Sequence, residues 1–203
     1  VGHEPLLITR TIAGKNNTST GAKHHFYSKG MNLFCFMPSS TPPRKSYMEI
    51  GEIYFWTATI HQWKLLLWTE EYKNVILRSL EYLSNTGKIS VYAFVIMPNH
   101  IHMIWKTLAL NGKETAQGSF LKYTAHEFRK LVLRDGKLPE YRVQAANKKH
   151  EFWKRDSLAF HLYTRKVARQ KLRYLHRNPI AKRWRLASCE SAYQFSSASF
   201  YEE

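Results

Sequence analysis

The pattern of hydrophobic and polar positions after Met48 predicts several strands. Residues 52–61 (containing IYFWTATI) and 88–97 (KISVYAFVIM) are rich in β-branched and aromatic residues, which is typical of strands. A Pro-Asn turn follows the second segment, and residues 100–106 (HIHMIWK) continue the strand pattern. These residues therefore predict one strand and then an antiparallel hairpin.

Helical spacing of apolar residues occurs between and after these strands. One helix is expected between Thr69 and Gly87, a second over residues 117–133, and a third over 165–177. The third ends at an Asn-Pro pair because a residue before proline avoids helical geometry. Residues 151–154 (EFWK) predict a short fourth strand. The order predicts an α+β fold: a ferredoxin-like βαββαβ antiparallel sheet with helices on one face and a functional C-terminal helix.

The first part of the chain has a different composition. Residues 1–47 are rich in Gly, Asn, Thr and Ser and end in a breaker cluster, SSTPP. The patterned region begins at Met48. We therefore expect residues 1–47 to be an N-terminal appendage or linker and residues 48–203 to form the functional domain.

The charge balance indicates a polyanionic partner. The chain has 31 Lys and Arg against 15 Asp and Glu, a net charge of +16. Thirteen of the basic residues lie between Lys148 and Arg185, where Glu151 and Asp156 are the acidic residues. Such an excess repels itself in a compact chain unless an anion relieves it, and nucleic acid is the usual anion.

Other features bear on location. No apolar stretch reaches the roughly 18 residues of a membrane span. No expected helix combines a broad apolar face with a lysine-rich one, which disfavours a membrane-surface protein. Cys35 and Cys189 lack metal-type spacing and are interpreted as reduced, so a cytoplasmic location is expected.

A His-x-His pair is the strongest local motif. His100 and His102 project from the same side of a strand, about 6.5–7 Å apart. Two imidazoles at this spacing can chelate one divalent ion. The spacing alone leaves open an ordinary pair of surface histidines.

The third expected helix places one tyrosine away from its packing face. At 100° per residue, Ala168, Leu172 and Leu175 form an apolar stripe, whereas Tyr174 lies on another line. Lys171 and Asn178 share that line, and Arg173 and Arg177 flank the tyrosine, so several cations favour its phenolate. A tyrosine packing its ring at the edge of the core is the alternative.

Together these motifs resemble the HUH single-tyrosine transposases, in the branch associated with repetitive extragenic palindromes (REP). MPNHIHMIW and, some 70 residues later, KLRYLHRNPIAKRW carry the resemblance. GSFLKYTAHEFRK, EFWKRDSLAFHLYT and SAYQFSSASFYE are similar to further blocks of that branch in the same order. The similarity covers nearly all of residues 48–203 and none of 1–47.

The resemblance implies a site and a reaction. His100, His102 and Asn178 would hold a divalent metal, Mg²⁺ or Mn²⁺, and Tyr174 would be the nucleophile. The implied activity is metal-dependent cleavage and strand transfer of single-stranded DNA through a 5′-phosphotyrosine. The implied partners are DNA hairpins or palindromic repeats, with a homodimer and a monomer both open. Basic residues around the tyrosine, where the family often has acidic ones, depart from the pattern.

The basic cluster is expected to hold the DNA backbone. The candidate DNA-binding residues are Lys148, Lys149, Lys154, Arg155, Arg165, Arg169, Lys171, Arg173, Arg177, Lys182, Arg183 and Arg185. Candidate rings for base stacking are Trp153, Trp184 and Phe195.

Two other functions fit the same residues. A DNA-binding module that has lost catalysis would share every basic residue. A zinc hydrolase would need a third strong ligand near the histidine pair, and His126, His161 and His176 are the candidates.

Overall fold

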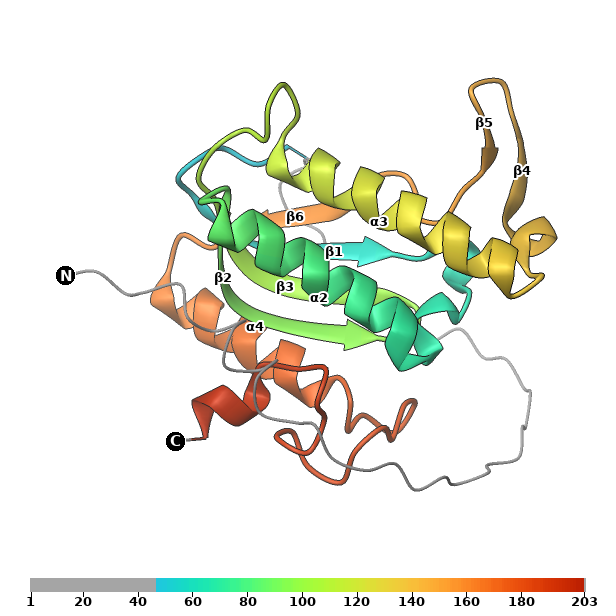
Figure 1. Ribbon diagram of the computed structural model, residues 1–203. Coiled ribbons are helices and arrows are strands. Elements are labelled where there is room, and N and C mark those ends of the chain that lie inside the picture. Colours follow the sequence, from blue (N-terminus) through green and yellow to red (C-terminus); the bar gives the residue numbers. More distant parts are fainter. Residues whose placement is uncertain (1–46, 203) are drawn as a thin grey trace, which may run out of the picture.

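The computed structural model describes residues 47–202, and its centre is a four-stranded antiparallel sheet. The strands are β1 (Ile53–Thr59), β2 (Ile89–Met97), β3 (His100–Thr107) and β6 (Leu158–His161), in the order β2-β3-β1-β6 (Figure 1). This is the strand order of a split βαβ sheet, so the ferredoxin-like prediction is confirmed. The predicted appendage lies, except for Tyr47, outside the described residues.

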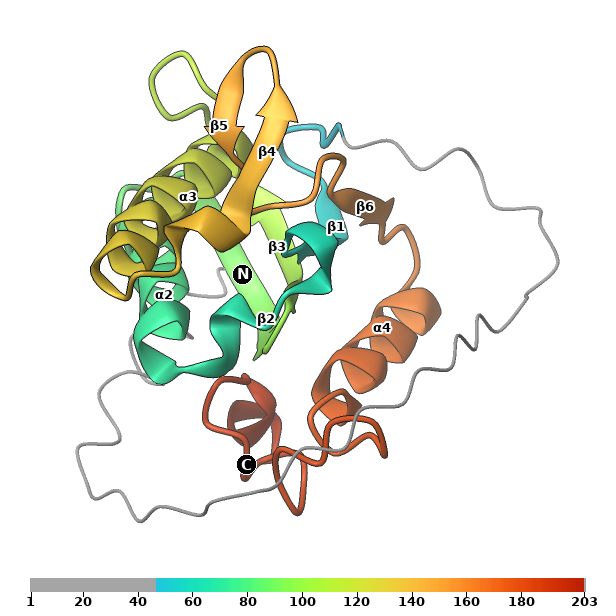
Figure 2. The ribbon, with the colours of Figure 1, turned by 90° about the vertical axis from the view of Figure 1, so that its right-hand side faces the viewer.

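Two helices pack on one face of the sheet and a third lies on the other. Helices α2 (Glu70–Asn85) and α3 (Ala116–Arg134) lie side by side, and α4 (Arg165–Arg177) lies across the sheet from them (Figures 1 and 2). The prediction that helices cover one face of the sheet therefore holds for α2 and α3. The C-terminal helix α4 lies on the opposite face. No helix within residues 47–202 has the length and apolar character needed to cross a membrane.

Short elements complete the described chain. They are the 3₁₀ turns η1 (His61–Trp63), η2 (Leu66–Trp68), η3 (Leu138–Tyr141) and η4 (Ala198–Tyr201), and the hairpin of β4 (Arg142–Ala145) and β5 (Lys148–His150). The hairpin projects beyond α3, away from α4 (Figures 1 and 2). The sequence patterns did not predict it.

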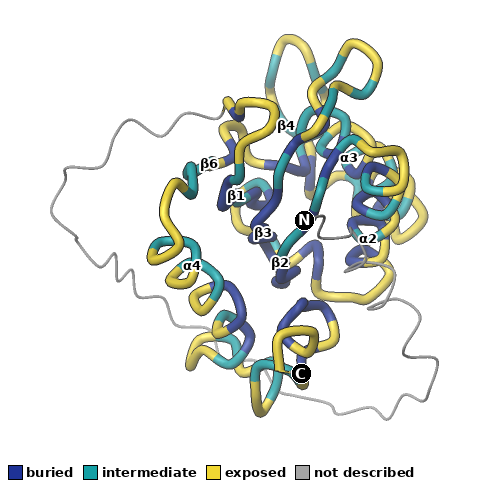
Figure 3. Tube along the Cα trace, turned by 90° about the vertical axis from the view of Figure 1, so that its left-hand side faces the viewer, coloured by how far each residue is buried: buried dark blue, intermediate teal, exposed yellow. Residues whose placement is uncertain are grey.

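Strand alternation divides the sheet into two faces. Trp56 and Trp105 are fully buried toward α3, where both pack against Phe120. Phe55 on β1 and His102 on β3 point to the opposite face, which α4 covers. In Figure 3 the central strands are buried along much of their length, whereas α4 is mostly exposed until its last turn.

The predicted fourth strand at residues 151–154 is wrong. The strand that joins the sheet is β6, which pairs with β1, while Trp153 makes one isolated bridge to Ile60. Phe152 and Trp153 are both buried although they are consecutive, and the Trp153 Nε1 donates to Thr124 Oγ1 on α3 at 2.9 Å. Phe152 and Trp153 therefore pack under α3. Two adjacent aromatic residues do not show from the sequence whether they belong to a strand or to a buried loop.

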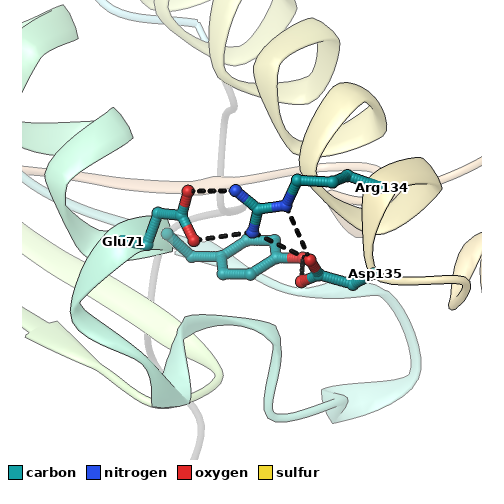
Figure 4. Close-up of polar contacts among 4 residues, drawn as sticks. Glu71, Arg134 and Asp135 are labelled. Carbon is teal, nitrogen blue, oxygen red and sulfur yellow. Dashed lines mark hydrogen bonds and ion pairs between the residues drawn. The ribbon is translucent and has the colours of Figure 1, made fainter.

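An ion cluster connects the start of α2 to the end of α3 (Figure 4). The Arg134 guanidinium donates to both Glu71 carboxylate oxygens at 2.6 and 2.7 Å and to Asp135 Oδ1 at 2.8 Å. The Tyr72 hydroxyl donates to Asp135 Oδ2 at 2.8 Å. Exposed pairs contribute little to stability, so this cluster joins the two helix ends but adds little to the free energy of folding.

The C-terminal segment covers the free edge of β2. The Ile96 N–H donates to Phe195 O at 2.9 Å, and the Ser197 N–H donates to Phe94 O at 2.9 Å. The Tyr193 hydroxyl donates to Ile96 O at 2.7 Å. An edge strand leaves unpaired backbone groups, and this irregular segment satisfies them.

Replacing Ser197 by alanine is expected to destabilise the domain by about 2–3 kcal/mol. The Ser197 hydroxyl is fully buried and lies 3.0 Å from both the Phe94 N–H and His176 Nε2 on α4, so the variant would leave two buried polar groups without a partner. Thermal unfolding measures the loss, and Ser199→Ala, at an exposed position nearby, is the matched control. Equal melting temperatures for the two variants would contradict this account.

Candidate metal and tyrosine site

The two predicted histidines lie together on one face of β3. Their ring centroids are 4.6 Å apart, and the side chains are 8% and 6% exposed. His100 starts the strand directly after the tight β2–β3 turn, and one intervening residue, Ile101, points into the core. Strand geometry therefore pairs the rings, as the motif predicted.

Asn99 determines which nitrogen of His100 is available. The Asn99 Nδ2 donates to the Trp63 carbonyl at 3.3 Å, which directs its Oδ1 to His100 Nδ1 at 2.7 Å. An amide oxygen accepts only, so His100 carries its proton on Nδ1. The Nε2 lone pair is then available for a metal, in the arrangement usual for metal-binding histidines.

His102 has a comparable support from the neighbouring strand. Thr57 faces His102 across the β1–β3 pairing, and its Oγ1 lies 2.7 Å from His102 Nδ1. The Phe55 ring stacks on the His102 ring with centroids 5.1 Å apart. Hydroxyl and aromatic ring together determine the orientation of the imidazole.

Burial keeps both imidazoles neutral at neutral pH. Burial, with a smaller contribution from the nearby Arg183, lowers the pKa of His100 to about 4. Burial, His100 and Lys171 hold the pKa of His102 well below its ordinary value. The neutral imidazole is the form that binds a metal ion.

Tyr174 reaches this pair from α4. Its ring centroid lies 5.3 Å from that of His102 and 6.0 Å from that of Phe55, yet the side chain is 52% exposed. Leu175, one residue on, is fully buried and anchors the helix, so the packing stripe and the tyrosine line are separate as predicted. The Tyr174 ring thus contacts His102 and Phe55 on one side, while about half of the side chain remains exposed.

Asn178 lies at the end of the same helix. It is the C-cap of α4, and its Nδ2 donates to the Tyr174 carbonyl at 2.9 Å. This bond uses the amide nitrogen, so the Oδ1 remains an acceptor that could serve as a metal donor. Two neutral imidazoles and one amide oxygen are a donor set that suits Mn²⁺ or Mg²⁺ with further positions for phosphate or water, so the residues fit the implied metal.

Lys171 is the cation beside the tyrosine. Its Nζ lies 5.0 Å from the Phe55 ring centroid, 5.1 Å from that of Phe160 and 6.0 Å from that of Tyr174. Arg177 instead pairs with Glu190 at 3.8 Å, and Arg173 lines a surface hollow. Of the three cations predicted near Tyr174, Lys171 therefore has the most direct electrostatic effect on the site.

The structure separates the predicted DNA-binding residues into groups. Arg169 and Arg173 line a hollow of about 550 Å³ on α4, and Arg165 is on the first turn of that helix. Lys182, Arg183 and Arg185 follow the helix, with Arg183 over the Trp184 ring at 4.9 Å.

The remaining candidates lie elsewhere. Lys148 and Lys149 are on the β4–β5 hairpin, away from α4, and Lys148 pairs with Glu151. Arg155 also approaches Glu151, at 3.6 Å. The exposed Lys154 is close to the site, because its N–H donates to Thr59 O at 2.7 Å and Thr59 faces His100.

The zinc hydrolase alternative lacks its third ligand. Residues 47–202 contain no group of three His, Cys, Asp or Glu side chains able to hold one ion. His126 pairs with Glu127 on α3, His161 with Glu52, and His176 with Ser197. Each of the three candidate third ligands therefore has its own polar partner and does not join the histidine pair.

Sequence patterns missed the supporting residues and placed two stacking candidates wrongly. Trp153 and Phe195 are buried in the core, whereas Trp184 is half-buried with its ring 6.1 Å from that of His100. Thr57 and Asn99 were not singled out. Only their positions beside the motif, on the facing strand and in the turn, could have indicated them.

Comparisons with known proteins identify the fold. No family model and no curated protein matches the chain. A solved REP-associated tyrosine transposase bound to a REP hairpin matches with a TM-score of 0.54 and 18% identity, over 80% of this chain and 84% of that one. A crystal structure of a candidate transposase from Deinococcus radiodurans R1 gives a TM-score of 0.39 and 13% identity, over 66% and 95%. The described chain therefore has the fold of a REP-associated tyrosine transposase, as the sequence resemblance implied.

Proposed function

We propose that the protein is a transposase-type enzyme that cuts and rejoins single-stranded DNA through a phosphotyrosine. The observation that carries the proposal is the approach of the Tyr174 ring to within 5.3 Å of His102, from a helix about 70 residues further along the chain. A hydroxyl nucleophile beside a pair of neutral imidazoles is an arrangement for phosphoryl transfer.

His100, His102 and Asn178 would hold Mn²⁺ or Mg²⁺. When bound, the metal would supply a Lewis acid for the scissile phosphate and a template that aligns it. Asn99 and Thr57 keep the two imidazoles in position for that role.

Tyr174 would perform the covalent step. Its Oη–phosphorus bond forms while the bond from phosphorus to the 3′ oxygen breaks, and the phenolic proton ends on the 3′ oxygen. The resulting 5′-phosphotyrosine conserves the bond energy, so a 3′-hydroxyl can later attack it and rejoin DNA without ATP. The Lys171 ammonium stabilises negative charge on the phenolate and phosphate as it develops.

The partner would be single-stranded or hairpin DNA. The net charge of +16 and the basic hollow on α4 favour a phosphate backbone that passes the exposed side of Tyr174. The solved protein of the same fold is bound to a REP hairpin, which supports a palindromic hairpin as the substrate class here.

The test is capture of the covalent intermediate. Protein is mixed with end-labelled single-stranded hairpin DNA, and a denaturing gel shows whether label stays on the protein. We expect a labelled band in Mn²⁺ or Mg²⁺ that disappears when a chelator is added first, whereas DNA retention in a native gel persists. Strong retention without an adduct in either metal would favour the DNA-binding module that lacks catalysis.

A further inference from the structure

A turn beside the histidine pair holds an exposed indole in a strained backbone conformation. Gln62 and Trp63 in η1 have φ angles of 55° and 58°, and Trp63 is 53% exposed. Two consecutive non-glycine residues in the left-handed region cost free energy, and such strain is commonly retained at functional sites. Burial of the ring does not offset this cost.

The turn is held firmly at both ends. The Ile60 N–H donates to Asn99 O at 2.8 Å, and the Leu67 N–H donates to Pro98 O at 2.9 Å. Both Ile60 and Leu67 are fully buried. The loop backbone is therefore anchored at both ends, while the indole that it carries remains 53% exposed.

The same turn is connected directly to the proposed metal site. Asn99 donates to the Trp63 carbonyl and holds His100 Nδ1 through its other amide atom. Lys154 lies along the other edge of β1, because its backbone N–H donates to the carbonyl of Thr59, and Thr59 faces His100 across the β1–β3 pairing. The turn that carries the exposed Trp63 ring and the segment that carries the exposed Lys154 are thus both joined by backbone hydrogen bonds to residues next to or facing His100.

We propose that the Trp63 indole stacks on an unpaired DNA base next to the scissile phosphate, while Lys154 contacts the adjoining backbone phosphate. This inference rests on the proposed function and adds a binding subsite to it. Every base has an apolar face, so stacking on an indole gives affinity with little sequence preference. The strongly basic chain favours a nucleotide over an uncharged partner at this ring.

The decisive variant is Trp63→Gly. Glycine removes the ring and also relieves the strain of the left-handed backbone. If Trp63 serves to stack on a base, this variant should bind DNA more weakly and yet have an equal or higher melting temperature. An indole needed only for packing would lower the melting temperature on removal. Trp63→Phe keeps a stacking ring and should retain most of the binding.

Binding is measured by anisotropy in chelator, with a labelled DNA hairpin that carries a single-stranded oligothymidine flank and the same hairpin without it. Trp63→Gly should weaken binding of the flanked hairpin by about 5- to 150-fold and leave the flush hairpin unchanged. Lys154→Ala should reduce the salt slope by about 1. Tyr82→Ala, which removes a 58% exposed ring from α2, is the matched control and should change neither.

The outcomes separate the two proposals. Equal loss on both hairpins, no loss, or a lower melting temperature of Trp63→Gly would overturn the stacking platform while leaving the proposed enzyme intact. Failure of the unaltered protein to bind either hairpin would overturn the platform and the proposed function together.

Discussion

Tyr174→Phe is expected to reduce formation of the covalent DNA adduct by at least about 10³-fold, because it removes the oxygen proposed as the nucleophile. The phenylalanine ring can keep the edge contacts that Tyr174 makes with His102 and Phe55. The side chain is half exposed, so the melting temperature should hardly change. Binding of hairpin DNA should also persist, since the basic surface is untouched.

The measurement is adduct yield on a denaturing gel, with native-gel binding of the same hairpin in parallel. Tyr123→Phe is the matched control, because Tyr123 is an exposed tyrosine on α3, across the sheet from α4. A full adduct yield from Tyr174→Phe would show that another residue is the nucleophile. Loss of both adduct and binding would show that the hydroxyl serves DNA binding.

His102→Gln is expected to lower the adduct rate by more than about 100-fold, which exceeds the usual cost of removing a residue that only supports a ligand. Glutamine lacks the imidazole ring that contacts Phe55 and Tyr174 but fills part of its volume, so the fold should survive. Circular dichroism checks the folded state, and the adduct assay is run over a range of Mn²⁺ concentrations.

Thr57→Val is a milder variant of the same site, because it removes the hydrogen-bond partner of His102 and keeps the imidazole. Valine has nearly the shape of threonine but leaves His102 Nδ1 without its 2.7 Å partner. The Mn²⁺ concentration for half-maximal adduct should rise by about 10- to 100-fold, and excess Mn²⁺ should restore the rate. Thr59→Val, on the same strand and face, is the control. Identical metal dependence in Thr57→Val and the control would contradict a metal held by His102.

The sequence alone determined the local elements of this protein. Strands and helices follow from apolar periodicity, which is a property of neighbouring residues, so β1, β2, β3, α2, α3 and α4 lie close to where the patterns predicted them. The same local geometry places His100 and His102 on one side of a strand and Tyr174 off the packing face of its helix. The motif spacing also indicated the fold that the structural comparison found.

Features that depend on distant residues were decided by the tertiary structure. Residues 151–154 have the composition of a strand, but the hydrogen bond from Trp153 to Thr124 and the packing of Phe152 draw them under α3. The edge of β2 is closed by an irregular segment near Ser197, which no periodic pattern marks.

In the candidate site, too, some residues follow from the sequence and others only from the fold. The sequence could name the two histidines, the tyrosine and Lys171 on the same helix line as the tyrosine. Only the fold shows that Thr57, on a facing strand, and Asn99, in a turn, hold the two imidazoles. Whether an aromatic ring is buried also depends on the neighbours that the fold supplies. For that reason Trp153 and Phe195 belong to the core, and Trp63 is left exposed beside the site.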